Sequence, residues 1–215
     1  MREIISGHIA QALAARTTWF VRVQDIQLYL ASWLINTQLY SNVYIEYHVP
    51  GILVPPYLLS DADNCYIDIV LEKDGAFYPV SIIYKTTEQW LQRFVFGQAI
   101  HSPLKSNTAH NVACYDFWKA IRKTEFLEAS FPPVKRGLVL FISNDALYQQ
   151  PPGNPHAGYA PFSVHQGRNV PAGSQLNWNV FSNVSNTRPG FGVNYHYVVN
   201  WVTLPFDRQH AYLLA

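Results

Sequence analysis

The segment from residue 66 to residue 87 constrains the fold of this chain most, because it reads as two strands joined by a tight turn. An apolar run with one embedded acid, Asp68, leads to a Lys-Asp-Gly turn at residues 73–75, and a second apolar run leads to Lys85. Apolar runs on both sides of an Asp-Gly pair predict a β-hairpin. Side chains along a strand alternate between the two faces of a sheet, so the hairpin also predicts which residues lie together.

Alternation divides the hairpin into a core face and a second face. The core face of the second strand consists of apolar and aromatic residues: Tyr78, Val80, Ile82 and Tyr84. The second face of that strand carries Ser81, Ile83 and Lys85. In the first strand the apolar set is Ile67, Ile69 and Leu71, which leaves Asp68 on the opposite face with Tyr66 and Val70. We therefore expect Asp68 to share one surface with the second face of the second strand.

A third acid precedes the hairpin. In the segment VYIEYHV at residues 43–49, every second residue from Val43 to Val49 faces one side, and Glu46 and His48 face the other. This period of two predicts a strand. Carboxylates on neighbouring strands suggest phosphodiester chemistry, because hydrolysis of a phosphodiester uses hard divalent cations that prefer oxygen ligands.

Together these features resemble the PD-(D/E)xK superfamily, the nucleases with the restriction-endonuclease-like fold. In that family an Asp on one strand faces an acid-x-Lys motif on the next strand, and a Glu before the hairpin joins the metal site. Glu46 and Asp68 match this pattern, whereas Ser81 and Ile83 stand where the family has the second acid and the lysine. The resemblance covers residues 23–148 and includes the helical segment YDFWKAIRK and the apolar segment LVLFI, a run typical of a strand covered on both faces.

The resemblance implies an α/β protein whose restriction-endonuclease-like core, a mixed central sheet flanked by helices, occupies residues 1–148. Residues 149–215 are expected to form an irregular, β-rich C-terminal extension packed on the same domain. Two amphipathic helices are expected before the first strand. The remaining expectations are a short helix over residues 87–96, a polar loop over residues 97–111 and a final strand over residues 195–201.

Composition limits the partners. The net charge is +1 and charged residues make up 13% of the chain, so a nucleic-acid site would have to be local. One stretch is rich in bases, which we expect on a solvated helix face: Lys119, Arg122, Lys123, Lys135 and Arg136. Cys65 and Cys114 form no CxxC pair, which fits a reducing, cytoplasmic setting, and no apolar run reaches the length of a membrane span.

Three functions stay open. The first is a catalytically impaired bacterial nuclease relative, which has kept the fold, lost part of the metal site and binds DNA, RNA or a partner protein. The second is an active Mg²⁺-dependent nuclease that uses Glu46, Asp68 and Lys85, although the Lys85 Cα lies ~6.6 Å beyond that of Ile83 along the strand. The third is a protein-interaction module without a nucleic-acid role. For the first function we expect Glu46 and Asp68 to bind Mg²⁺ or Mn²⁺ weakly.

Overall fold

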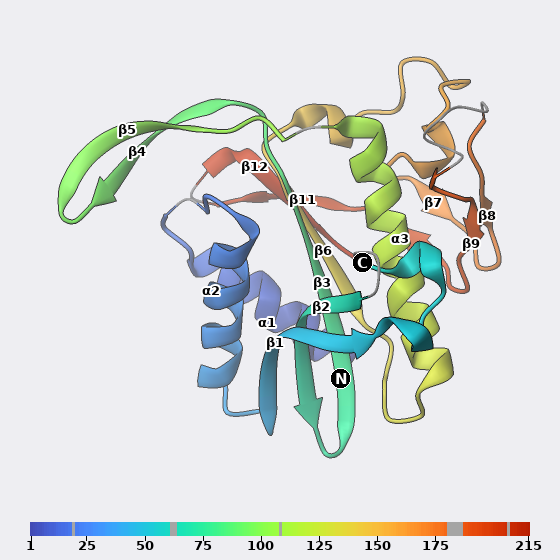
Figure 1. Cartoon of the computed structure of the whole chain (residues 1–215). Helices are drawn as coiled ribbons and strands as arrows, with labels where there is room; N and C mark the ends of the chain where they lie inside the picture. The colour runs from blue at the N-terminus through green and yellow to red at the C-terminus, as the bar shows by residue number, and fades with distance from the viewer. Residues whose placement is uncertain (19, 61–63, 108, 180–186, 206) are drawn as a thin grey trace.

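The central element is a mixed β-sheet. The computed structural model describes residues 1–18, 20–60, 64–107, 109–179, 187–205 and 207–215. Within these residues six strands form one sheet in the order β1-β2-β3-β6-β12-β11 (Figure 1). Their bounds are β1 Asn42–Pro50, β2 Asn64–Lys73, β3 Ala76–Lys85, β6 Leu138–Ser143, β12 Asp207–Leu214 and β11 Trp201–Leu204. The β3–β6 pair is parallel and the other neighbours are antiparallel, which confirms the expected α/β fold with a mixed central sheet.

Two N-terminal helices cover one face of the sheet. Helices α1 (Arg2–Ala15) and α2 (Val23–Asn36) confirm the two helices expected before the first strand. They pack on alternate residues of the central strands, in a cluster that includes Ile69, Leu71, Val80, Ile82 and Leu140. Among the described residues, none of the helices combines the length and apolarity that a membrane crossing requires.

Helix α3 (His110–Ser130) covers the opposite face. It packs on the odd-numbered residues of β6, Val139 and Phe141, while the even-numbered residues of β6 point to α1 and α2. All six residues of β6 are buried. The expectation that residues 138–142 form a strand covered on both faces is therefore confirmed.

The C-terminal extension wraps the outer side of α3 and then returns to the sheet. It contains short 3-10 helices and two-residue strands: η3 Ala146–Gln149, η4 Ala160–Phe162, β7 Asn169–Val170, β8 Gln175–Leu176, β9 Phe191–Gly192 and β10 Tyr197–Val198. Residues 195–201 were expected to form the final strand, and this expectation is wrong. The segment contains only β10 and the first residue of β11, and the final strand is β12, which pairs with β6. Strand β6, one of the two partners of β12, is more than sixty residues away in sequence, so no local pattern identifies that pairing.

A second correction concerns residues 87–111. The expected helix and polar loop are replaced by a hairpin of β4 (Gln89–Val95) and β5 (Gln98–Leu104), which projects from the body as an arm (Figure 1). The turn residues Phe96 and Gly97 have φ angles of 49° and 81°. Positive φ at two successive residues belongs to the tight turn of a two-residue hairpin, and tryptophan, phenylalanine and valine favour strands. These local preferences prevail over the helical spacing of the apolar residues.

Candidate functional site

A polar pocket of about 250 Å³ lies between the β2–β3 hairpin and α3. Its walls come from the loop before β2, from the two strands and from one side of α3: Leu58, Leu59, Ser60, Asp68, Ser81, Ile82, Ile83, Asp116, Lys119, Ala120 and Lys123. The pocket thus brings Asp68 together with Ser81 and Ile83, as the hairpin alternation predicts. The predicted core face of β3 is also confirmed, because Tyr78, Val80, Ile82 and Tyr84 pack with α1 and α2.

Ser81 lies buried in this pocket with 3% of its surface exposed. Its hydroxyl oxygen has no hydrogen-bond partner among the described residues. Ile83, two residues further along β3, packs toward the α3 side of the sheet. A hydroxyl and an aliphatic side chain therefore occupy the places where the resemblance implies a carboxylate and a lysine.

The Asp68 carboxylate is already bonded on both oxygens. Oδ1 accepts a hydrogen bond of 2.8 Å from Gln27 Nε2 on α2, and Oδ2 accepts one of 2.8 Å from the Ile82 backbone N–H. Burial raises the pKa of Asp68, and these hydrogen bonds and the nearby Lys123 charge oppose that effect. Both donors are neutral, so within the described parts of the chain the carboxylate has no directly bonded cation.

Strand β2 departs from the expected alternation at Asp68. Ile69 and Leu71 pack toward α1 and α2, but Ile67 lies with Val70 and Leu127 in a third apolar cluster. The prediction that Ile67, Ile69 and Leu71 share one face is therefore wrong for Ile67. The pairing of β2 with β3 ends at Ile69 and Val80, so the two strands separate where Asp68 turns toward the Ile82 N–H.

Glu46 lies apart from the pocket. It lies between the Ile45–Ile69 and Tyr47–Ile67 pairs of β1 and β2 and has no paired residue there, and its side chain is exposed and absent from the pocket lining. Its φ angle is 51°, which interrupts the regular pairing between Ile45 and Tyr47. The nearby His48 bonds to the Asn64 side chain at 2.9 Å.

Lys85 is half-buried at the end of β3 and is likewise absent from the pocket lining. Its charge acts on Asp116 of α3. Burial raises the pKa of Asp116, and the charges of Lys85, Arg188 and Lys119 oppose this rise. Lys85 therefore interacts electrostatically with a carboxylate of α3 and does not line the pocket.

Helix α3 contributes three polar residues that the sequence interpretation did not assign to the site, although it expected Lys119 and Lys123 on a solvated helix face. Asp116, Lys119 and Lys123 follow one another at spacings of three and four, which places them on one side of a helix. Lys119 Nζ donates to the Leu59 carbonyl at 2.8 Å, and Lys123 Nζ donates to the Tyr66 carbonyl at 2.8 Å. Burial lowers the pKa of Lys119, and Asp116 opposes this. The helical spacing is the signal that could have identified them.

Most of the basic stretch is consequently not a solvated helix face, although Lys135, which follows the helix, is exposed. Lys119, Arg122 and Lys123 are each half-buried, and Arg122 reaches Glu125 at 3.5 Å. Arg136 stacks on the Tyr195 ring at 4.0 Å. These bases hold the extension and the loop before β2 in place, which leaves less positive charge for a nucleic acid than the sequence suggests.

The side chains that line the polar pocket are poorly suited to hold Mg²⁺ tightly. Of the acids in the described chain, Asp68 and Asp116 line the pocket, and Lys119 and Lys123 bring two positive charges to the same walls. Among the described residues no group of three or more His, Cys, Asp or Glu side chains is arranged to hold a metal ion. Mg²⁺ takes hard oxygen ligands, and nearby lysines oppose its charge.

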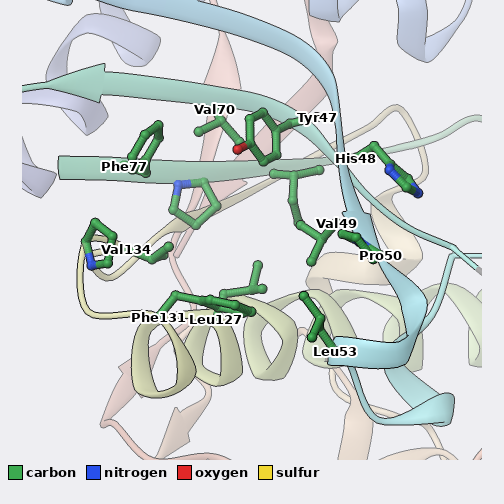
Figure 2. A pocket seen from close by; sticks show the side chains of 13 residues that line it. Tyr47, His48, Val49, Pro50, Leu53, Val70, Phe77, Leu127, Phe131 and Val134 are labelled. Atoms are coloured by element: carbon green, nitrogen blue, oxygen red, sulfur yellow. The ribbon is translucent and has the colours of Figure 1, made fainter. Parts of the chain in front are cut away.

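A second, apolar pocket of about 250 Å³ lies between β1, β2, β3 and the C-terminal end of α3 (Figure 2). Phe77, Leu127, Phe131 and Val134 surround it, and it shares no lining residue with the polar pocket. Comparison of the whole chain with family models, with curated proteins and with solved structures finds no match.

Proposed function

We propose that this chain is a restriction-endonuclease-like protein with an impaired metal site, which binds its ligand without cutting it. The main support for the proposal comes from the hydrogen bonds and the neighbours of Asp68. Its carboxylate bonds to Gln27 and to the Ile82 N–H, and it faces Ser81 and Ile83 in one pocket. The pocket therefore has Ser81 and Ile83 beside Asp68, at the strand positions where the resemblance implies a carboxylate and a lysine, and Glu46 lies outside it.

Nucleic acid is the ligand class that the resemblance implies, and the pocket offers local support for it. Lys119 and Lys123 bring positive charge to the walls of the pocket, where both Nζ atoms also donate to backbone carbonyls. The net charge of +1 limits the electrostatic contribution. Binding should therefore be weak, and its affinity should decline only modestly with salt, because few phosphates are neutralised.

Metal titration tests the impairment directly. Isothermal titration of the chain with Mg²⁺ and Mn²⁺ should give at most one weak site, because few charged ligands face the pocket. The double variant Ser81→Glu/Ile83→Lys should bind Mn²⁺ more tightly, since a carboxylate and a cation return to the expected face, and slow cleavage of DNA would accompany it. Each single variant serves as a matched control, because grouped catalytic residues act non-additively.

Three outcomes would contradict the proposal. Tight binding at two sites in the unmodified chain would show an intact centre. Cleavage by the unmodified chain, lost in Asp68→Ala, would show an active nuclease. Absence of DNA and RNA binding in fluorescence anisotropy at 50 mM salt would favour the interaction module without a nucleic-acid role.

An active nuclease remains the second candidate, and the polar side of α3 favours it. Asp116 adds a carboxylate to the pocket, and Lys119 or Lys123 can replace the missing strand lysine without any contribution from Lys85. If this candidate is correct, Mn²⁺-dependent cleavage should fall at least 100-fold in Asp116→Asn and in one of Lys119→Met and Lys123→Met. Lys85→Met should leave cleavage within a few-fold of the unmodified chain.

A further inference from the structure

The apolar pocket has no role in the proposed function. Its space of about 250 Å³ lies between the sheet and the C-terminal end of α3, and Figure 2 shows side chains from both sides around it. Phe77 comes from β3, Leu127 comes from α3, and Leu53 comes from the 3-10 helix η1 (Gly51–Leu53). An apolar cavity of about 150 Å³ already holds benzene, so this pocket has room for two fused rings.

An irregularity in two neighbouring strands creates the floor of the pocket. Residues three apart on a regular strand face opposite sides, yet Ile67 and Val70 of β2 both belong to the apolar cluster that contains Leu127. Strand β1 is irregular at the same level, where Glu46 has no paired residue. Irregularities of this kind often redirect side chains beside binding sites. The floor is buried, whereas 49% of the surface of Leu53 at the edge of the pocket is exposed.

Backbone hydrogen bonds fix one wall of the pocket. The Phe77 N–H donates to the Pro133 carbonyl at 2.9 Å, and the Phe77 carbonyl accepts from the Lys135 N–H at 2.8 Å. The turn after α3 is thereby held against β3. Pro50, Pro79 and Pro133 all line the pocket, and each proline ring restricts its own φ angle. The walls are therefore formed before a ligand arrives, so little conformational freedom is lost on binding.

The lining selects against charge. None of the described residues that line the pocket is a lysine, arginine, aspartate or glutamate. A charged ligand would lose its hydration there without gaining an ionic partner. Tyr47, Phe77 and Phe131 instead present aromatic rings, which pack favourably on another ring in offset or edge-to-face contact. The chemistry of the lining thus fits an uncharged aromatic ligand.

One polar group of the lining is available to such a ligand. The His48 ring already bonds through Nε2 to the Asn64 side chain at 2.9 Å. The Tyr47 hydroxyl makes no hydrogen bond to any residue that the structure describes. A few placed polar groups commonly orient the ligand in an apolar site. We therefore expect one hydrogen-bonding group at the edge of the ligand.

The adjoining edge of the sheet disfavours a peptide as the occupant. Strand β1 is outermost in the described sheet, and a peptide that adds to such an edge needs a regular row of backbone N–H and C=O groups. Glu46, with a φ angle of 51°, interrupts this row, and Pro50 at the end of β1 has no N–H. A small molecule requires only the pocket.

We propose that the apolar pocket is a binding site for a small, uncharged aromatic molecule of about two fused rings, with one hydroxyl or N–H group that bonds to the Tyr47 hydroxyl. The rings lie between β3 and the end of α3, against Phe77 and Phe131. A ligand of roughly ten non-hydrogen atoms should bind with a dissociation constant on the order of 10–100 µM. Because the two pockets share no lining residue, this site is independent of the proposed function.

Two probes of nearly equal shape test the site in the unmodified full chain. The first is 2-naphthol, which is uncharged at neutral pH, and the second is 2-naphthoate, which carries a carboxylate. Isothermal titration should give one site for 2-naphthol and an affinity at least about 10-fold lower for 2-naphthoate. In ¹H–¹⁵N NMR spectra, 2-naphthol should shift the backbone amide signals of Phe77, Phe131 and Val134 most.

Variants on β1 test the location. Val49 is half-buried in the lining, so Val49→Phe fills the pocket and should weaken 2-naphthol binding at least about 10-fold. Ile45→Phe is the matched control, because Ile45 lies on the same strand outside the lining and is exposed. It should leave the dissociation constant within about twofold. Tyr47→Phe should weaken 2-naphthol binding about threefold to tenfold, through the loss of one hydrogen bond.

Four results would overturn the proposal. They are no binding of 2-naphthol up to its solubility limit, equal affinity for both probes, amide shifts confined to residues around the polar pocket, and tight binding by a folded Val49→Phe variant. If Val49→Phe does not fold, the two probes and the amide shifts in the unmodified chain decide the question. Failure here leaves the proposed function standing, because metal and nucleic-acid binding test that function separately.

Discussion

In the polar pocket, the ionised side chain of Asp68 lowers the stability of the fold by an amount that depends on pH. Burial raises the pKa of Asp68, and two neutral hydrogen bonds offset only part of this effect. A carboxyl whose pKa is higher in the folded than in the unfolded chain stabilises the fold fully below the unfolded value of about 3.9. That stability is lost as the pH rises through the folded pKa. At neutral pH the ionised Asp68 therefore opposes folding.

Replacement of Asp68 by asparagine should accordingly stabilise the chain at neutral pH. The new amide oxygen can accept from the Ile82 N–H, and a rotated Gln27 amide can accept from the new amide nitrogen, so only the buried charge is lost. A gain of about 1 kcal/mol would raise the melting temperature by about 2–4 °C in a chain of this length.

Thermal unfolding of both proteins between pH 4 and pH 8 measures this difference. The gain from Asp68→Asn should shrink as the pH falls through the folded pKa of Asp68. Asp74→Asn, at an exposed position of the β2–β3 turn with a φ angle of 51°, is the matched control. A lower melting temperature for Asp68→Asn at pH 8 would mean that the charge itself stabilises the pocket.

Glu46 illustrates a backbone constraint at the residue scale. Its positive φ angle of 51° lies in the left-handed region, which glycine adopts freely and β-branched residues avoid. Glu46→Gly should therefore be close to neutral, whereas Glu46→Val should lower the free energy of unfolding by about 1–3 kcal/mol. Urea unfolding compares the two variants. Equal stability of both variants would show that residue 46 adopts an ordinary strand conformation in solution.

At the scale of elements, one buried carboxylate joins α3 to the C-terminal extension. Glu125 is 1% exposed and accepts hydrogen bonds from the backbone N–H groups of Asn194 and Tyr195 and from the Tyr197 hydroxyl. Arg122 approaches it at 3.5 Å. Three hydrogen-bond donors of the extension thus share one acceptor on α3, the Glu125 carboxylate, and this fixes the extension to the helix.

Glu125→Gln should destabilise the chain by about 3 kcal/mol or more, because an amide group would face donors that it cannot all satisfy. Guanidinium unfolding followed by tryptophan fluorescence measures the loss. Glu128→Gln is the matched control, because Glu128 is half-buried and accepts from the Tyr195 hydroxyl at 2.9 Å. We expect it to cost about 1 kcal/mol. Equal effects would indicate that the buried network contributes no more than a surface bond.

The elements that the sequence predicts are those with strong local patterns. Alternation around the Asp74-Gly75 turn identifies β2 and β3, and the continuous apolar run identifies β6. The arm was missed because the spacing of Leu91 and Phe94 also fits a helix. The positive φ angles at the tip of the arm are what distinguish the hairpin from the helix. In the pocket, Ser81 and Ile83 follow from alternation, but Asp116 and Lys119 enter through packing between distant segments.

On the scale of the whole molecule, the central sheet combines strands from both halves of the chain. Strand β12 lies between β6 and β11, and Ala215 exchanges backbone hydrogen bonds with Val139 at 2.8 and 3.0 Å. The extension therefore completes the core sheet in addition to covering α3. This long-range pairing could not be read from local sequence, because the partner of a strand is set by the fold as a whole.

Removal of residues 207–215 should therefore abolish cooperative unfolding. It uncovers one edge of β6 and removes Leu213, which is fully buried. A shortened arm, with residues 93–100 replaced by Asn-Gly, keeps Leu91 and Leu104 and should change the melting temperature by less than about 2 °C. Calorimetry of both variants distinguishes these cases. A sharp transition in the chain that lacks residues 207–215 would show that β12 is dispensable.

The position of β12 also sets the order in which a newly made chain can fold. Strand β6 is wholly apolar except for Ser143, and its open edge has no partner until residue 207 has been synthesised. At translation rates of ~5–20 residues per second, the nascent chain spends several seconds with this edge exposed. An uncovered apolar edge pairs readily with other chains. Slower synthesis lengthens the interval in which the edge of β6 is exposed. Because an exposed edge pairs with other chains, the yield of folded protein should depend on chaperones that bind the growing chain.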